Sequence, residues 1–238
     1  EQLLAVTIGF TDTIMVSNLG ENAVSAVSLV DTINILLISI FTALATGGTV
    51  VTSQFLGQDN RKEARDSAKQ LILITGLLAI IIMMFCLIFN KSLLKLIFGS
   101  IDYEIMKQAQ TYFYITALSY PFIALYNSGA ALFRVMGNSK ISMINALIMN
   151  IVNIVLNSIF IFGFNLGVLG SGLATLCARI LTATVILLML KNKENSIYIN
   201  NYHTFKWNWI YIKKILFIGV PAGLENGMFQ LGKILVQS

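Results

Sequence analysis

Four long stretches of this 238-residue chain contain no Asp, Glu, Lys or Arg: residues 32–58, 70–90, 108–133 and 141–178. A helix needs about 20 apolar residues to cross ~30 Å of hydrocarbon. Each stretch is therefore long enough for one crossing, and the last is long enough for nearly two. Hydrophobic residues make up 56% of the chain and charged residues 11%. The chain is thus predicted to be an all-α, polytopic membrane helical bundle, and a disordered chain is excluded.

The apolar stretches predict seven approximate membrane helices. Glycine and asparagine at residues 163–167 favour the turn between the fifth and the sixth. The chain is apolar almost from Glu1 and ends within its last apolar segment. We therefore expect a fragment that begins inside its first helix and ends inside its seventh. The predicted ranges are 1–19, 23–50, 68–90, 109–133, 141–163, 168–190 and 212–238.

The basic residues are unevenly distributed among the connections between these helices. Eleven lie in the 2–3, 4–5 and 6–7 connections, and three lie in the others. Because cytoplasmic loops are enriched in Lys and Arg, the even-to-odd connections are predicted to be cytoplasmic. The net charge of +5 then reflects membrane topology, and no nucleic-acid partner is expected. Arg61, Arg65 and Lys69 share one face of a predicted short surface helix, which we interpret as facing lipid headgroups rather than a protein partner.

Charged side chains inside the apolar segments are candidate functional groups, because a charge at mid-bilayer costs at least ~2.5 kcal/mol. Asp12 lies roughly 10 Å along its helix from the turn at Gly20. It suits a group that takes up and releases a proton or binds Na⁺, although a hydrogen bond to a neighbouring helix is an alternative. Asp31 is a weaker candidate, because its position allows it to reach the outer interface.

Two further charged residues lie in the later segments. Arg179 is near the middle of the sixth segment, where a structural ion pair and a substrate role are both open. Glu225 follows Gly219, Pro221 and Gly223. Proline and glycine can interrupt a membrane helix and free backbone carbonyls beside a carboxylate, as at the ion sites of transporters.

Uncharged polar residues of the fifth and sixth segments are the remaining candidates. Asn153 and Asn157 are one turn apart on one face, and Thr175 lies in a segment of small residues. Such side chains can join membrane helices by hydrogen bonds. Helix packing and ligand binding are both open for them.

Four motifs occur in a characteristic order along nearly the whole chain. They are Thr11-Asp12-Thr13-Ile14-Met15-Val16, Ser53-Gln54-Phe55-Leu56-Gly57-Gln58, Arg134-Val135-Met136-Gly137-Asn138-Ser139-Lys140 and Phe217-Ile218-Gly219-Val220-Pro221. Together they resemble the multidrug and toxic compound extrusion (MATE) transporters, in the NorM- and DinF-like bacterial branch.

The resemblance implies a twelve-helix antiporter of two six-helix lobes. Such a protein exports small organic cations in exchange for Na⁺ or H⁺ and is not an enzyme. Residues 1–190 would form the N-terminal lobe, 191–211 a cytoplasmic linker and 212–238 the start of the second lobe. The protein is expected to be a monomer in the cell (inner) membrane, surrounded by lipid and with no cofactor besides its coupling ion.

The resemblance also assigns roles to individual residues. Asp12 matches the carboxylate of the first helix, and Asn153, Asn157 and Thr175 match the polar positions that surround it. Glu225 matches a glutamate that serves the second lobe. Many relatives have Asn-x-x-x-Asp-Pro in the fifth helix, whereas this chain has Asn157-Ser158 at its end. A relay of two acids is therefore not expected, and Asp12 with Asn157 is the predicted Na⁺ site.

Two alternatives to a cation antiporter are open. A lipid-linked oligosaccharide flippase of the same superfamily carries an anionic pyrophosphate and needs several basic groups, but the membrane segments supply only Arg179 and Lys233. A non-transporting membrane scaffold is expected to tolerate Asp12→Asn.

Overall fold

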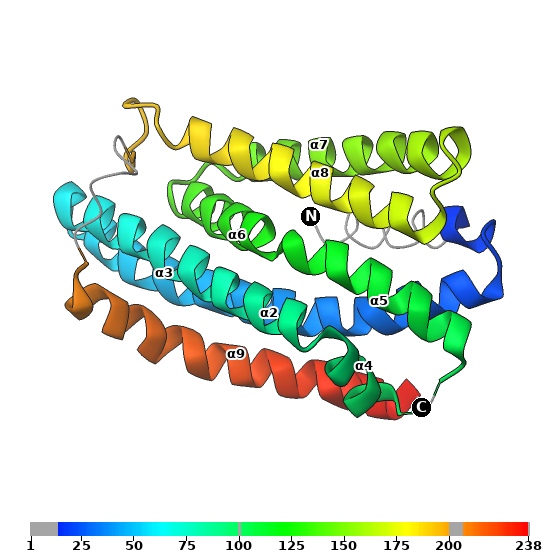
Figure 1. The fold of residues 1–238 in the computed structure, drawn as a ribbon. Helices are drawn as coiled ribbons and strands as arrows, with labels where there is room; N and C mark the ends of the chain where they lie inside the picture. Colours follow the sequence, from blue (N-terminus) through cyan, green and yellow to red (C-terminus); the bar gives the residue numbers. More distant parts are fainter. Residues whose placement is uncertain (1–13, 100, 200–206, 238) are drawn as a thin grey trace. The chain divides into compact units, whose positions relative to one another are not determined.

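A computed structural model describes residues 14–99, 101–199 and 207–237 of the chain, with the side chains of 226 and 229–237 left aside. Every regular element in these residues is a helix (Figure 1). The predicted all-α class is confirmed. The elements are α2 (Glu21–Gly57), α3 (Arg61–Ile88), α4 (Asn90–Phe98), α5 (Tyr103–Leu118), α6 (Tyr120–Val135), α7 (Ser139–Asn157), the π-helix η1 (Ser158–Gly163), α8 (Gly167–Met189) and α9 (Trp209–Gln237).

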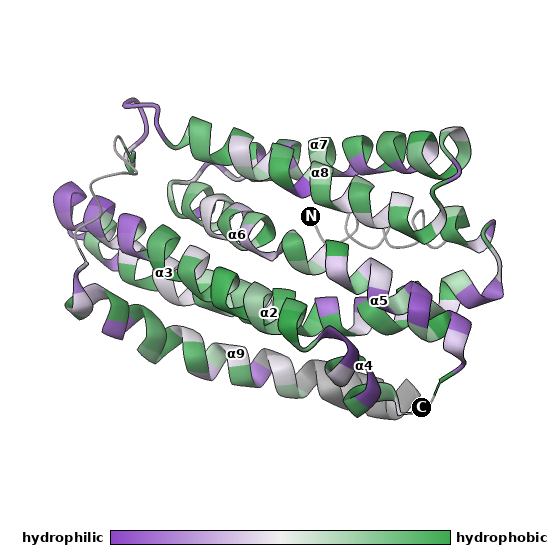
Figure 2. Cartoon of the chain, in the orientation of Figure 1, coloured by the Kyte–Doolittle hydropathy of each residue, from purple (hydrophilic) through white to green (hydrophobic). Residues whose placement is uncertain are grey.

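Four of the described segments are long and apolar enough to cross a membrane: α2, α3, α7 with η1, and α8. Apolar residues run along them, and hydrophilic residues gather near helix ends (Figure 2). In α3, large apolar side chains at Ile80, Met84 and Ile88 are 46%, 49% and 68% exposed. They are spaced by four residues and so share one helix face. A large exposed apolar face of this kind fits contact with lipid.

The predicted helix over residues 109–133 is wrong as a single element. The structure has two 16-residue helices there, α5 and α6, separated at Ser119. Pro121 explains the break, because proline has no N–H to donate to the carbonyl of Ala117 and its ring collides with that carbonyl. The nine-residue helix α4 was not predicted at all.

The end of the fifth predicted segment changes its helical type. After Asn157 the chain continues as η1, and the N–H of Phe164 donates to the carbonyl oxygen of Ile159, five residues earlier, at 3.0 Å. Asn165 and Gly167 then adopt positive φ angles of 52° and 59°. Asparagine and glycine tolerate this left-handed conformation best, so the predicted turn is confirmed.

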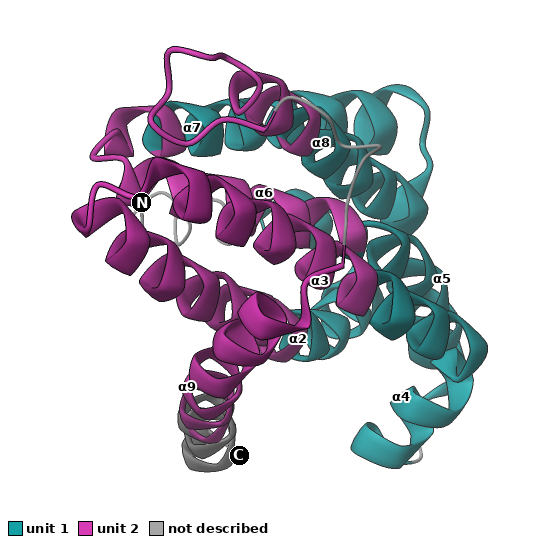
Figure 3. Ribbon diagram, turned by 90° about the vertical axis from the view of Figure 1, so that its left-hand side faces the viewer, with its two compact units in different colours: residues 1–35, 80–120, 143–182 teal, residues 36–79, 121–142, 183–238 magenta. Residues whose placement is uncertain are grey.

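The chain divides into two compact units (Figure 3). Unit 1 contains residues 1–35, 80–120 and 143–182, and unit 2 contains residues 36–79, 121–142 and 183–238. Each unit gathers segments that are far apart in the sequence. The long helices α2, α3 and α8 each contribute to both units.

Within unit 2, α2 and α9 pack closely at glycines. A Cβ atom on Gly47 would lie 2.5 Å from the carbonyl oxygen of Ile215 and 2.6 Å from the backbone nitrogen of Gly219. No side chain fits in that space. Small residues of this kind let two membrane helices approach backbone to backbone.

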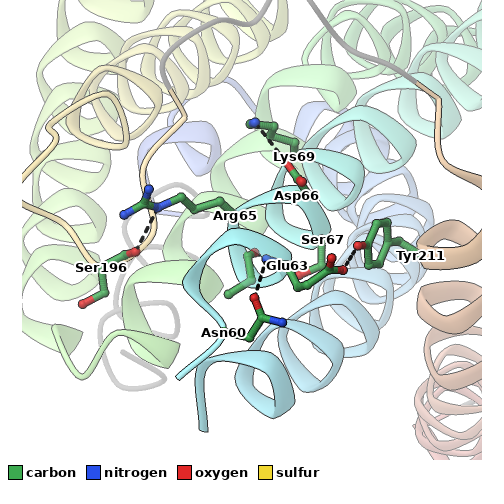
Figure 4. Close-up of polar contacts among 9 residues, drawn as sticks. Asn60, Glu63, Arg65, Asp66, Ser67, Lys69, Ser196 and Tyr211 are labelled. Carbon is green, nitrogen blue, oxygen red and sulfur yellow. Dashed lines mark hydrogen bonds and ion pairs between the residues drawn. The ribbon is translucent and has the colours of Figure 1, made fainter. Parts of the chain in front are cut away.

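Unit 2 also connects the start of α3 with residues after α8 (Figure 4). Arg65 Nε donates to the carbonyl oxygen of Ser196 at 3.4 Å, and its guanidinium carbon lies 3.9 Å from the ring centroid of Tyr198. Lys69 Nζ lies 3.1 Å from Asp66 Oδ1. The predicted lipid-facing role of these basic residues is therefore wrong for Arg65, which binds the 191–199 segment.

The same end of α3 also contacts the start of α9. The hydroxyl of Tyr211 donates to Glu63 Oε2, and the Tyr211 ring packs edge-on against Phe55 with 5.9 Å between centroids. The residues that follow α8 are held by burial as well, because Ile197 and Ile199 are fully buried. In unit 2, therefore, both polar and apolar contacts hold residues 196–199 after α8.

Candidate ion and substrate site

The structure brings three of the predicted site residues together in unit 1, between α7 and α8. Asn157 Nδ2 donates to Asn153 Oδ1 at 3.1 Å, and Asn153 Nδ2 donates to Thr175 Oγ1 at 3.2 Å. Asn153 and Asn157 are buried, and Thr175 is half-buried. We call Asn153, Asn157 and Thr175 the amide cluster.

The local structure explains this arrangement. Asn153 and Asn157 are four residues apart on a regular helix, so their side chains share a face. Asn157 is also the last residue before η1. Short π-helical segments occur frequently at functional sites. In this chain, the change from α-helix to π-helix begins directly after Asn157 of the amide cluster.

The chemistry of the amide cluster is that of neutral oxygens and amide donors. Each asparagine offers a carbonyl oxygen with two lone pairs and an NH₂ group, and Thr175 offers a hydroxyl. Such groups can ligate a small cation or form a hydrogen bond with a substrate. Asp12, which was predicted to supply the negative charge, lies outside the described residues.

Asp31 lies in a second polar group of unit 1. Its Oδ1 accepts hydrogen bonds from Asn34 Nδ2 at 3.1 Å and from the Tyr112 hydroxyl at 3.3 Å. The Tyr120 hydroxyl donates to Asn34 Oδ1 at 2.8 Å. Asn34, Tyr112 and Tyr120 are buried and Asp31 is half-buried. We call these four residues the aspartate network.

The position of Asp31 differs from the expectation that it could reach the outer interface. It lies ten residues after the first residue of α2, or about 15 Å along the helix axis. Its hydrogen-bond partners come from α2 itself and from α5. The carboxylate therefore belongs to the interior of unit 1.

Arg179 points to the break between α5 and α6. Its Nη1 donates to Ser119 Oγ at 2.6 Å, and the Ser119 hydroxyl donates to the carbonyl oxygen of Thr116 at 2.5 Å. Pro121 creates this break, so the irregular backbone places Ser119 where the guanidinium can reach it. Arg179 thus faces the helix bundle, as predicted.

Glu225 is placed differently from the other candidates. It lies on α9 in unit 2 and is exposed. The expected helix interruption is wrong, because α9 continues through Pro221. Glu225 and the amide cluster thus belong to different compact units.

Four residues of these polar groups were not predicted from the sequence: Asn34, Tyr112, Ser119 and Tyr120. Two signals were present in the sequence. Asn34 lies one turn after Asp31, and Pro121 marks the break that exposes Ser119 to Arg179. Tyr112 had no comparable signal, because its role depends on the packing of α5 against α2.

Other features of the described residues do not add to the site. No group of three or more His, Cys, Asp or Glu side chains in the described ranges could hold a metal ion. Unit 1 has a cavity of about 360 Å³ with Leu19, Glu104, Lys107 and Leu166 in its lining. Of the predicted site residues that the structure describes, none lines this cavity.

Comparison with known proteins identifies the family. The MatE family model matches residues 1–159. The uncharacterized transporter YisQ of Bacillus subtilis is 28% identical over 99% of this chain and 52% of its own length. The probable multidrug resistance protein NorM of Thermotoga maritima is 25% identical over 99% of this chain and 51% of its own. The multidrug export protein MepA of Staphylococcus haemolyticus is 27% identical over 91% of this chain and 46% of its own length.

Solved structures agree on the fold. An inward-facing MATE family multidrug resistance transporter of the MOP superfamily matches with a TM-score of 0.87 at 24% identity, over 97% of this chain and 51% of that one. An outward-facing structure with the same family description matches with a TM-score of 0.86 at 24% identity, over 94% of this chain and 49% of that one. The chain spans about half the length of the relatives it matches. Since the family model covers well over half of its residues, this multi-pass membrane protein belongs to the MATE family of transporters.

Proposed function

We propose that the full-length protein is a secondary active antiporter of the cell (inner) membrane that exports small organic cations in exchange for Na⁺ or H⁺. Family membership supports transport, and the names of the NorM and MepA relatives support multidrug export. The uneven distribution of basic residues supports cytoplasmic even-to-odd connections.

The amide cluster is the observation that carries this proposal. It is a set of buried polar side chains between α7 and α8, both of which are long and apolar enough to cross a membrane. Polar groups inside membrane segments are costly and mark ion and substrate pathways. Asp12 supplies the negative charge of the site. The neutral oxygens of Asn153, Asn157 and Thr175 favour Na⁺ as the coupling ion.

Transport follows an alternating-access mechanism. The coupling ion enters from outside, neutralises Asp12 and favours the state that releases the drug. Such exchange requires only that ion and drug prefer different conformations. Glu225, on the first helix of the second lobe, attracts the positively charged substrate.

A lipid-linked oligosaccharide flippase fits the contacts of Arg179 less well. An anionic pyrophosphate needs basic groups that are available in a cavity, whereas Arg179 donates to Ser119. The cation antiporter therefore stays the better supported function.

The test is dye transport by the full-length protein in inverted membrane vesicles. Vesicles loaded with Na⁺, and separately acidified vesicles, are mixed with ethidium, and dye uptake is followed by fluorescence. One gradient is expected to drive uptake, and Asp12→Asn is expected to abolish it. Asn157→Leu should weaken activation by the coupling ion about 10–100-fold, a range typical of lost ligand-shell groups.

Asn145→Ala is the matched control. Asn145 lies on the same helix and donates to the backbone carbonyl of Thr182 at 3.1 Å, so this variant removes an interhelical hydrogen bond outside the amide cluster. It should keep the ion dependence of the wild-type protein. A correctly inserted protein that moves no dye under either gradient would refute the proposed function.

A further inference from the structure

We propose that Asp31 and Arg179 form an opposed-charge pair that sets the cation affinity of the amide cluster. Arg179 weakens cation binding there, and Asp31 offsets the charge of Arg179. The inference rests on the proposed function, because it assumes that the amide cluster binds the coupling cation.

Arg179 lies one helical turn from the amide cluster. Thr175 and Arg179 are four residues apart on α8, which places their Cα atoms about 6 Å apart on one helix face. Thr175 accepts the hydrogen bond from Asn153. A guanidinium keeps its positive charge in proteins, so a permanent charge lies beside a proposed cation site.

The position of this charge is fixed by the break between α5 and α6. Arg179 Nη1 donates to Ser119 Oγ at 2.6 Å, and Ser119 is itself bonded to the carbonyl oxygen of Thr116. Arg179 is thereby held within unit 1 rather than extended toward the lipid. The positive charge of Arg179 therefore repels a cation that enters the amide cluster.

Asp31 supplies the compensating negative charge. Its Oδ1 accepts hydrogen bonds from Asn34 Nδ2 and from the Tyr112 hydroxyl, and hydrogen bonds to a carboxylate favour its ionised form. Asp31 and Arg179 are joined through neighbouring residues, because Ser119 binds Arg179 while Tyr120 donates to Asn34, which donates to Asp31.

An alternative is that Asp31 and Arg179 only hold the helices together through the same contacts. This alternative predicts a different effect on cation binding. If the pair only braces the helices, removing either charge loosens unit 1 and weakens cation binding in both cases. If the pair acts through charge, the two removals shift affinity in opposite directions. A unit charge about 10 Å away, at an effective dielectric constant of ~20, changes an ion's affinity by roughly tenfold.

The experiment measures Na⁺ binding to the purified full-length protein by isothermal titration calorimetry. Arg179→Gln should bind Na⁺ roughly tenfold more tightly than the wild-type protein, and Asp31→Asn roughly tenfold more weakly. The double variant should return close to wild-type affinity. Arg179→Lys, which keeps the charge, should do the same.

Ser119→Ala separates charge from bracing, because it removes the hydrogen bond and leaves both charges in place. The Na⁺ affinity of Ser119→Ala should stay within about threefold of the wild-type affinity, which is a small change compared with the tenfold effect expected from removing a charge. Shifts in the same direction for both charge removals, no shift in either, or an equal effect of Ser119→Ala would each overturn the inference. If Arg179→Gln fails to fold alone, the double variant is compared with Asp31→Asn: removing Arg179 in that background should tighten Na⁺ binding roughly tenfold if the pair acts through charge, and should weaken it further if the pair only braces the helices.

Failure of the proposed function gives a different result. A wild-type protein that binds no Na⁺ refutes Na⁺ coupling, and proton uptake by the same panel, followed with a pH indicator, then tests the pair with H⁺. A wild-type protein that binds neither cation refutes both the proposed function and the inference that rests on it.

Discussion

At the scale of single residues, unit 1 is distinguished by polar side chains that bond to one another inside apolar helices. Tyr120 and Asn34 are both buried, and 86 positions separate them in the sequence. Hydrocarbon offers no replacement partner for a polar group that loses its bond. Removing one partner therefore leaves the other as an unpaired buried polar group, which lowers the stability of the fold.

Tyr120→Phe tests this cost. The change deletes the hydroxyl that donates to Asn34 Oδ1 at 2.8 Å, and the free energy of unfolding should fall by about 1–3 kcal/mol. Tyr114→Phe is the matched control, because Tyr114 is on α5 and is 51% exposed. Unfolding in mixed detergent micelles measures both variants, and equal stability of the two would show that Asn34 does not depend on Tyr120.

At the scale of elements, backbone irregularities and glycines decide where helices meet. Pro121 breaks the segment between α5 and α6 and places Ser119 beside Arg179. Gly47 lets α2 contact the backbone of α9. Neither effect follows from mean hydropathy, because both depend on the position of one residue within an apolar run.

Gly47→Ala tests the contact between α2 and α9. The added Cβ would lie 2.5 Å from the carbonyl oxygen of Ile215, so the helices must separate, at a cost of about 1–3 kcal/mol. Gly57→Ala is the control, since Gly57 is also on α2 and has no atom within 4 Å of the added Cβ. Thermal unfolding of the purified protein should show a lower midpoint for Gly47→Ala alone.

At the scale of the whole molecule, segments distant in sequence form each compact unit, and the membrane supplies the surroundings of their apolar faces. Arg65 and Ser196, which are hydrogen-bonded in unit 2, are 131 residues apart. The basic residues predict which connections face the cytoplasm. This topology can be tested without assigning any transport activity.

Cysteine labelling on intact cells tests the topology. Lys91→Cys and Lys193→Cys are introduced separately into a protein that carries Cys86→Ala and Cys177→Ala; both lysines are exposed. A membrane-impermeant maleimide should label position 91 in intact cells and position 193 only after permeabilisation. The reverse pattern would show that the even-to-odd connections face outward.

Much of the fold and part of the site could be predicted from the sequence. Charge-free stretches predicted the four described segments that are long and apolar enough to cross a membrane, because the length of hydrocarbon to be crossed is fixed. Asn153 and Asn157 were grouped correctly because helical periodicity puts residues four apart on one face. The break at Ser119 and the continuous helix through Pro221 were not predicted, since a proline's effect depends on the packing around it.

The sequence by itself thus determined the helical class, the four described segments that could cross a membrane and the family, because these depend on apolar length and on local motifs. Only the tertiary structure decided which polar residues meet. It joined Asn153 to Thr175, Arg179 to Ser119 and Tyr112 to Asp31. Contacts between different helices depend on how each helix is rotated about its axis and on where it is broken. A hydropathy pattern specifies neither the rotation nor the position of the break.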